Sequence, residues 1–275
     1  MERRRFLLFL AAGLTGAAVA RGTADLVEPE RAAAAPPLPA ADAEPLVPAV
    51  GRPLDPPVGA VDQLPGDGTS LALTIDDGTS SEVVAAFCTF AADTGVRLTF
   101  FPNGRYRSWE ENGDLLQPLI DSGQVAMGNH TWSHPDLTTI GDDQVAEEIG
   151  RNRAWLASTF GVRETPFFRP PFGAHDDRTD RIAAEAGHPT ICLWNGTLED
   201  HRPISEAELM AAAREWFAAQ AIIVGHANQP TVTRVYDQLV ELIQERGLQT
   251  VTLADVWAAP SLARAGATSG SAALA

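Results

Sequence analysis

Short apolar runs of strand length alternate with helical stretches along the middle of the chain. In 142–161, for example, apolar residues recur at helical spacing. The runs that predict strands cover 71–75, 97–102, 124–128, 166–170, 190–194, 221–225 and 248–253. The stretches that predict helices cover 82–95, 109–123, 142–161, 177–187, 205–219 and 232–247. This alternation predicts parallel strands joined by helical crossovers.

The predicted strands are apolar throughout, as expected when helices cover both faces of a parallel sheet. Ser80 and Ser81 provide an N-cap for the first helix, whereas Gly113 and Pro118 interrupt the helix predicted over 109–123. A barrel and an open doubly wound sheet both fit this pattern. In either fold, functional residues lie just past the carboxyl ends of the strands.

The two ends of the chain differ in composition from its middle. Residues 21–66 contain ten of the twenty prolines and long alanine runs, which is typical of an extended or disordered linker. Residues 261–275 have the same character and predict a disordered tail. We therefore predict one folded domain over residues 67–260.

The first twenty residues resemble an export signal. Arginines at positions 3 to 5 precede the apolar run 6–19, which ends in a small-residue A-x-A exit at Ala20. About 15 apolar residues are few for a membrane span, so we expect no stable span after cleavage. A twin-arginine signal, a general secretory signal and an uncleaved anchor all stay open. We predict a secreted or cell-wall-associated protein.

The net charge limits the binding partners that the chain can have, and the cysteine content limits its disulfides and structural metal sites. The formal net charge of −16 argues against binding to nucleic acid or anionic lipid through a basic patch. The two cysteines, Cys88 and Cys192, lie in different predicted elements and have no C-x-x-C spacing. This pattern favours two buried free thiols over a disulfide and does not indicate a structural zinc site.

Polar residues capable of metal binding or acid–base chemistry follow several predicted strands. The run 71–75 is followed by two adjacent aspartates, and the run 124–128 leads into two histidines four positions apart. The residues of this kind at or after strand ends are Asp76, Asp77, His130, His134, Arg169, Asp200, His201 and His226. Their shared location predicts that they meet at one end of the strands.

Two imidazoles and one carboxylate among these residues could hold a metal ion. His130 and His134, at i and i+4, fall on one side of a helical or turn segment. Asp76 and Asp77 point to opposite sides of a regular strand, so we expect one to bind metal and the other to stay free nearby. Gly78 allows the chain to turn at this point. Three ligands with open positions suit Zn²⁺ or another divalent transition metal.

Each motif alone also has an ordinary structural explanation, such as a turn, a surface arginine or a satisfied core histidine. The order of five motifs is more specific. The segments TIDDG, HTWSH, RPPFG, LWNGTLED and IIVGH resemble the motifs of the polysaccharide deacetylases, carbohydrate esterase family 4, which share the NodB homology domain. The resemblance covers residues 71–257. It implies an α/β fold, a distorted and incomplete (β/α) barrel, with one divalent ion: zinc, or else cobalt or another transition metal.

The resemblance also implies roles for individual residues. Asp76 is similar to the family's general base, and Arg169 to the residue that pairs with it. His226 looks like the general acid, and Asp200 like the carboxylate that orients it and raises its pKa. The implied metal ligands are Asp77, His130 and His134. The residues implied to contact substrate are Pro171, Phe172, Trp194 and Val224.

Four positions depart from the family pattern. Ile75 replaces a usual Phe and Phe172 a usual Tyr, and both swaps keep the backbone roles, including the Phe172 N–H that is similar to the family's oxyanion donor. His201 stands where a Trp is usual, and Ala227 where an Asp is usual. These changes bear on the walls of the substrate groove and leave the implied metal ligands intact.

The function expected from this resemblance is a secreted, monomeric, metal-dependent deacetylase of a cell-wall or extracellular polysaccharide. N-acetyl groups in peptidoglycan or chitin are the first candidates, and O-acetyl groups of xylan stay open. Two alternatives also stay open: a metal-dependent amidase or imidase acting on a small molecule, and a carbohydrate-binding protein with a degenerate site. A closed cup would favour the first alternative, and loss of a ligand or base residue would favour the second.

Overall fold

Strands and helices alternate along the described part of the chain, which is residues 53–258 of a computed structural model. The strands are β1 (Gly59–Val61), β2 (Ser70–Asp77), β3 (Leu98–Pro102), β4 (Val125–Met127), β5 (Phe167–Phe168), β6 (Thr190–Cys192), β7 (Gly196–Thr197), β8 (Ile222–His226) and β9 (Gln249–Thr250). The α-helices are α1 (Ser81–Thr94), α2 (Ser108–Glu111), α3 (Gly113–Asp121), α4 (Asp142–Phe160), α5 (Asp177–Glu185), α6 (Glu206–Trp216), α7 (Tyr236–Glu245) and α8 (Leu253–Val256). The 3₁₀ turns are η1 (Leu137–Thr139), η2 (Pro171–Gly173) and η3 (Val232–Arg234).

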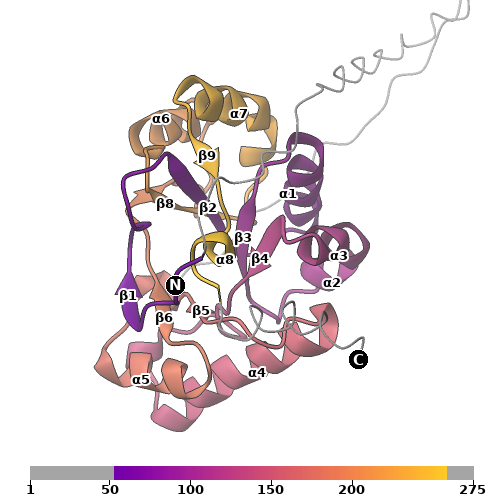
Figure 1. The fold of residues 1–275 in the computed structure, drawn as a ribbon. Coiled ribbons are helices and arrows are strands. Elements are labelled where there is room, and N and C mark those ends of the chain that lie inside the picture. The colour runs from indigo at the N-terminus through magenta and orange to yellow at the C-terminus, as the bar shows by residue number, and fades with distance from the viewer. Residues whose placement is uncertain (1–52, 259–275) are drawn as a thin grey trace, which may run out of the picture. The chain divides into compact units, whose positions relative to one another are not determined.

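All ladders between the described strands are parallel. Six strands form one sheet, in the order β4-β3-β2-β8-β7 with β9 against β2, and three form a second sheet, in the order β1-β6-β5. An isolated bridge between Asn129 and Phe168 connects the β4 side of the first sheet to β5. No ladder among the described strands joins the remaining edge strands, β1 and β7. The strands thus form a barrel that is open on one side (Figure 1), and the expected incomplete (β/α) barrel is confirmed.

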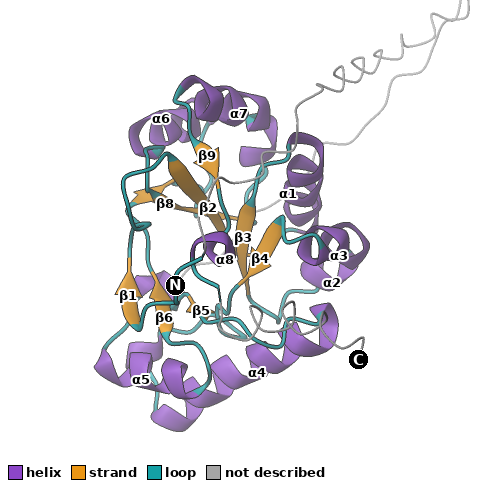
Figure 2. Ribbon diagram, viewed as in Figure 1, coloured by secondary structure: helices purple, strands orange, loops and turns teal. Residues whose placement is uncertain are grey.

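Helices lie above, to the right of and below the strands in the view of Figure 2. Local sequence explains where α1 begins and ends. At the start of α1, the Ser80 hydroxyl accepts a hydrogen bond from the Val83 N–H. At its end, Gly95 takes a left-handed conformation with a φ of 74°. The largest apolar cluster joins the strands to α1, α3, α4, α6 and α7. It takes Leu71, Leu73 and Ile75 from β2, whereas Ala72 lies in a second apolar cluster. The two clusters together explain why the strand sequences are apolar on both faces.

The predicted elements differ from the structure in several places. Pro118, expected to interrupt a helix, lies inside α3, and the break falls at Asn112 instead. The stretch 232–247 begins as η3 and becomes α7 only at Tyr236, because Val235 leaves the helical region with a φ of −124°. The stretch 248–253 contains only the short strand β9, since the Thr252 side chain caps α8. Strands β1 and β7 contain three and two residues, too few to produce an apolar pattern in the sequence.

Residues 53–66 differ from the prediction that places them in a linker. Strand β1 pairs with β6, and the Leu64 side chain is only 2% exposed. The prediction is wrong here because a three-residue strand is held by backbone hydrogen bonds, which leave no mark in composition. The predicted export signal, most of the linker and the tail lie outside the described residues. Within 53–258, no helix has the length and apolar character needed to cross a membrane.

Both cysteines are free and buried, as predicted. Cys88 in α1 and Cys192 in β6 belong to different apolar clusters. Burial raises the pKa of each thiol to about 12. Neither cysteine is therefore a nucleophile near neutral pH.

Candidate active site

Strand β2 ends in two aspartates whose carboxylates approach the same imidazole. Asp77 has a φ of 69° and Gly78 a φ of 99°, so the strand is irregular at its last residue. A side chain at Gly78 would clash with the Trp109 ring, and only glycine fits there. Asp76 Oδ2 lies 3.8 Å from His130 Nε2, and Asp77 Oδ1 lies 3.5 Å from the same nitrogen. The left-handed conformation of Asp77 thus overcomes the tendency of adjacent strand residues to point apart.

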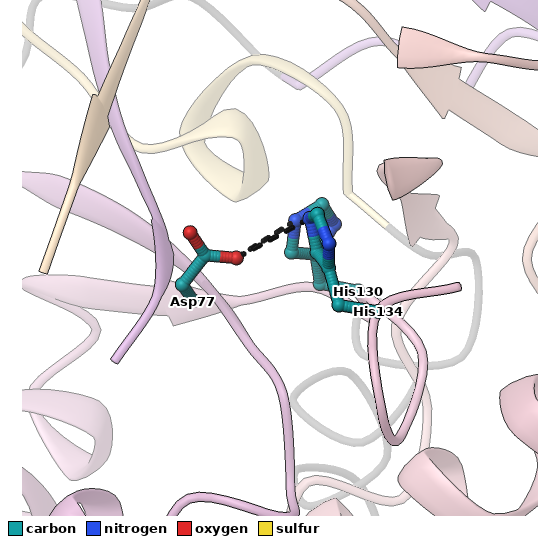
Figure 3. Close-up of side chains that lie close together, drawn as sticks. All are labelled: Asp77, His130 and His134. Carbon is teal, nitrogen blue, oxygen red and sulfur yellow. Dashed lines mark ion pairs between the residues drawn. The ribbon is translucent and has the colours of Figure 1, made fainter. Parts of the chain in front are cut away.

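The two histidines of the HTWSH segment lie on the loop after β4, and both face Asp77 (Figure 3). His130 Nε2 and His134 Nε2 lie 3.5 and 3.4 Å from Asp77 Oδ1. The loop turns tightly, because Thr131 and His134 have positive φ angles of 67° and 64°. Such conformations in non-glycine residues cluster at functional sites. The structure therefore brings the three predicted ligands together.

The carboxylate of Asp77 and the imidazoles of His130 and His134 are the three metal-donor groups, called the donor cluster below. They are close enough to share one ion. One donor atom from each lies within 4.8 Å of the others. Tetrahedral bonds of about 2.0–2.2 Å separate ligand atoms by about 3.4 Å, which is close to the distances from Asp77 Oδ1 to the two imidazoles. The Nδ1–H of His130 donates to the Arg169 carbonyl at 2.6 Å and leaves the Nε2 lone pair facing the carboxylate. Metal-binding histidines have this arrangement, so the residues fit a divalent ion.

Arg169 connects this cluster to Asp76. Its buried guanidinium donates to Asp76 Oδ1 at 2.9 Å and to the Thr74 hydroxyl at 2.6 Å. Two backbone carbonyls at and after the end of β6 accept its other hydrogen bonds. Pairing offsets the large cost of burying either charge alone. Asp76 is therefore a carboxylate held in one orientation beside the three donor groups.

His226, at the end of β8, forms a second ion pair with the buried Asp200. The His226 ring donates through Nδ1 to Asp200 Oδ1 at 2.9 Å, and its backbone N–H donates to Oδ2 at 3.0 Å. Burial lowers the pKa of His226, but the hydrogen bond and the charge of Asp200 outweigh burial and raise it to about 9. The expected rise in this pKa is confirmed. His201 is exposed, and its ring centroid lies 6.1 Å from that of His226.

The pKa values of Asp77 and His134 favour the forms that bind metal. Burial favours the neutral form of Asp77, but the interaction with His130 and the charges of nearby histidines outweigh burial, so its pKa lies well below the ordinary value. Burial, together with repulsion from His130, lowers the pKa of His134. A charged carboxylate and a neutral imidazole are the states that ligate a divalent ion.

The residues implied to contact substrate lie in different environments. Phe172 is 69% exposed, has a φ of 61°, and meets His134 edge-on with ring centroids 4.5 Å apart. Trp194 is half-buried, and Pro171 is buried at the start of η2. Val224 differs from the expectation, because its side chain is 3% exposed within β8 and is not available to a substrate. Phe172 is the member of this set best placed to line an open groove.

A buried polar network supports the histidine loop, and the sequence interpretation missed it. Asn129 accepts hydrogen bonds from the Thr131 N–H and from Asn152, and it donates to a carbonyl of α4 and to His188 Nε2. His188 donates through Nδ1 to a backbone carbonyl, and burial lowers its pKa to about 4. The signal available in the sequence is the position of Asn129 directly before His130.

Comparison with protein families assigns the part of the chain that contains the donor cluster. Residues 63–191 match the family model described as Polysaccharide deacetylase. Residues 63–191 of the chain belong to the polysaccharide deacetylase family. The family match includes the three donor groups and the Asp76–Arg169 pair, and it ends before Asp200 and His226.

Two named relatives align with about two thirds of the chain. The peptidoglycan-N-acetylglucosamine deacetylase PgdA of Listeria monocytogenes is 28% identical over 191 residues, covering 68% of this chain and 38% of the relative. The chitin deacetylase of Arthroderma benhamiae is 27% identical over 203 residues, covering 71% of this chain and 53% of the relative. This chain therefore spans about half, or less, of the length of these two members of the family.

A solved structure supports the fold assignment. The family 4 carbohydrate esterase pseudoenzyme from Bacillus anthracis is similar to this chain with a TM-score of 0.64 and 20% identity, covering 74% of this chain and 69% of that one. At this identity the similarity shows a shared barrel and carries no information about activity. The function of this chain must therefore be argued from its own residues.

Proposed function

We propose that the protein is a secreted, metal-dependent deacetylase that removes acetyl groups from a cell-wall or extracellular polysaccharide. The observation that carries this proposal is the convergence of Asp77, His130 and His134 beside the Asp76–Arg169 pair. The names of the Listeria and Arthroderma relatives support an N-acetylated polymer such as peptidoglycan or chitin. Zn²⁺ is the first candidate ion, because imidazole and carboxylate are common zinc ligands.

The residues around the cluster can carry out the proton transfers of amide hydrolysis. A divalent ion would polarise the acetyl carbonyl and lower the pKa of a water molecule. Asp76, oriented by Arg169, accepts a proton as the water oxygen bonds to the acetyl carbon. The Phe172 N–H donates a hydrogen bond to the resulting oxyanion. His226, oriented by Asp200, donates a proton to the amine as the C–N bond breaks, which yields acetate and a free amino sugar.

The surroundings of the cluster support a polymer over a small molecule. Phe172 places an exposed aromatic ring 4.5 Å from the His134 ring, so one side of the site is an open apolar surface. An enclosed cup would bury most of the surface of a small ligand instead. Export through the signal predicted at residues 1–20 would bring the enzyme to cell-wall polymers.

Acetate release tests the proposed function. The protein is incubated with N-acetylglucosamine oligomers, peptidoglycan and acetylated xylan, with and without a chelator. We expect acetate from at least one N-acetylated polymer, loss of release with the chelator, and recovery with added Zn²⁺. Binding to these polymers without release at any metal loading would instead identify a carbohydrate-binding protein. Release from small amides alone would identify an amidase.

A further inference from the structure

Asn228, just past the end of β8, contacts the carboxylate of the proposed metal ligand Asp77. The Asn228 Nδ2 donates to Asp77 Oδ2 at 2.7 Å. The other carboxylate oxygen, Oδ1, is the one that lies 3.5 and 3.4 Å from the imidazoles of His130 and His134. The two oxygens of Asp77 therefore have separate partners: one faces the donor cluster, and the amide of Asn228 holds the other.

Thr79 sets the orientation of the Asn228 amide. Asn228 Oδ1 accepts hydrogen bonds from the Thr79 N–H at 3.0 Å and from the Thr79 hydroxyl at 2.8 Å. Because a backbone N–H can only donate, the amide oxygen must face Thr79 and the amide nitrogen must face Asp77. A flipped amide would lose the bond to the Thr79 N–H and would place two oxygens against each other at Asp77.

Backbone hydrogen bonds place Asn228 beside the end of β2. The Ala227 N–H donates to the Asp76 carbonyl at 3.0 Å, and the Ser80 N–H donates to the Ala227 carbonyl at 3.2 Å. These bonds continue the contact with β2 and the residues after it past His226, the last residue of β8. Ala227 itself is fully buried. Asn228 therefore projects from a segment that is tied to the same strand that carries Asp77.

We propose that Asn228 is a positioning residue that holds Asp77 as a one-oxygen metal ligand, and that Thr79 holds Asn228 in turn. This inference rests on the proposed function, because it requires an ion at Asp77. A carboxylate whose second oxygen is already hydrogen-bonded is oriented before the ion arrives, and such partners of ligands strengthen metal binding. The neutral amide provides this orientation without adding a charge to the site.

The Zn²⁺ affinity of Asn228→Ala, measured by competition with a chelator of known affinity, tests the inference. We expect the Kd for Zn²⁺ to rise about 10-fold or more relative to wild type. We also expect the melting temperature of the metal-free protein to stay unchanged, because the bonds of Asn228 are partly or fully exposed to solvent. A merely structural role would lower that melting temperature and leave the Kd unchanged.

Two substitutions of Thr79 provide a matched pair. Thr79→Ser keeps the hydroxyl that donates to Asn228, and we expect the wild-type Kd. Thr79→Val removes the hydroxyl but keeps the backbone N–H, and we expect the Kd to rise about two- to threefold. Equal Zn²⁺ affinity in wild type and Asn228→Ala would overturn the inference and leave the proposed function standing. Failure of the wild-type protein to bind Zn²⁺, Co²⁺ or any other divalent transition metal would overturn both.

Discussion

The donor cluster has a strand side, Asp77 at the end of β2, and a loop side, His130 and His134 on the loop after β4. Different interactions hold the two sides in place. Asp77 ends β2, which pairs with β3 and β8 over most of its length. The two histidines lie on a loop without such a ladder, and a buried network of Asn129, Asn152 and His188 supports it instead. Strand pairing satisfies backbone groups directly, whereas a buried loop needs polar side chains to satisfy them. The loop side therefore depends on more side chains than the strand side.

Asn103, just after β3, joins these two sides. Its backbone N–H donates to the Asp77 carbonyl at 3.1 Å. Its side chain donates to the carbonyls of His130 at 2.5 Å and Thr131 at 3.2 Å. The spacing between the end of β2 and the histidine loop thus depends on a residue outside the donor cluster. Single substitutions can therefore test three roles separately: the metal ligand His130, the base Asp76, and Asn129, which supports the loop.

Removal of an imidazole from the loop side should have the largest effect. In His130→Ala two donor groups remain, and we expect Zn²⁺ affinity to fall at least about 100-fold, because residues behind the ligands already contribute 10- to 100-fold. Acetate release should be lost with it. Chelator competition measures the affinity. Zn²⁺ binding as tight as in wild type would contradict the assignment of His130 as a ligand.

Neutralising Asp76, the carboxylate next to the ligand Asp77 on β2, should affect catalysis and not metal binding. In Asp76→Asn the amide oxygen can still accept from Arg169, but the side chain cannot take a proton. We expect kcat/KM to fall about 10²–10⁴-fold, with Zn²⁺ affinity close to wild type. Acetate-release kinetics and chelator competition measure the two quantities. A loss of Zn²⁺ affinity as large as in His130→Ala would make Asp76 a ligand.

Substitution of Asn129 tests the support behind the loop. Asn129→Ala removes one hydrogen-bond partner each from the Thr131 N–H, Asn152 and His188. We expect the free energy of unfolding to fall by about 1–3 kcal/mol, measured by denaturant unfolding of the metal-free protein, and Zn²⁺ affinity to fall as well. Asn228→Ala on the strand side is the control, since it should weaken metal binding without this loss of stability. Unchanged stability of Asn129→Ala would show that the loop does not need the network.

The pH dependence of the rate should show the smallest effect. Asp200 raises the pKa of His226 to about 9, so His226 is protonated below this pH and loses its proton above it. A nearby divalent ion would lower this pKa, so we expect kcat/KM to decline at or below about pH 9, by about tenfold per pH unit once His226 is deprotonated. Asp200→Asn should move the decline to lower pH. A rate that stays constant to pH 10 would exclude His226 as the acid.

The sequence by itself determined the order of elements and the location of the site. Apolar runs and helical periodicity depend on nearby residues, so β2, α1 and α4 lie close to their predicted ranges. The rule that functional residues follow strand ends selected both aspartates and the two histidines, and the family resemblance implied that Asp77, not Asp76, joins His130 and His134 as a ligand. Local sequence also explains the start of α1 at Ser80 and its end at Gly95.

Only the tertiary structure decided how these residues are oriented and supported. Asp77 has a left-handed conformation and lies beside Gly78, where the distant Trp109 ring leaves no room for a side chain. Asn129 and His188 are 59 positions apart, and Asn228 and Asp77 are 151 apart. No periodicity relates residues at such separations. They meet because the parallel strands bring distant segments to one end of the barrel, where polar groups left without water must find partners in one another.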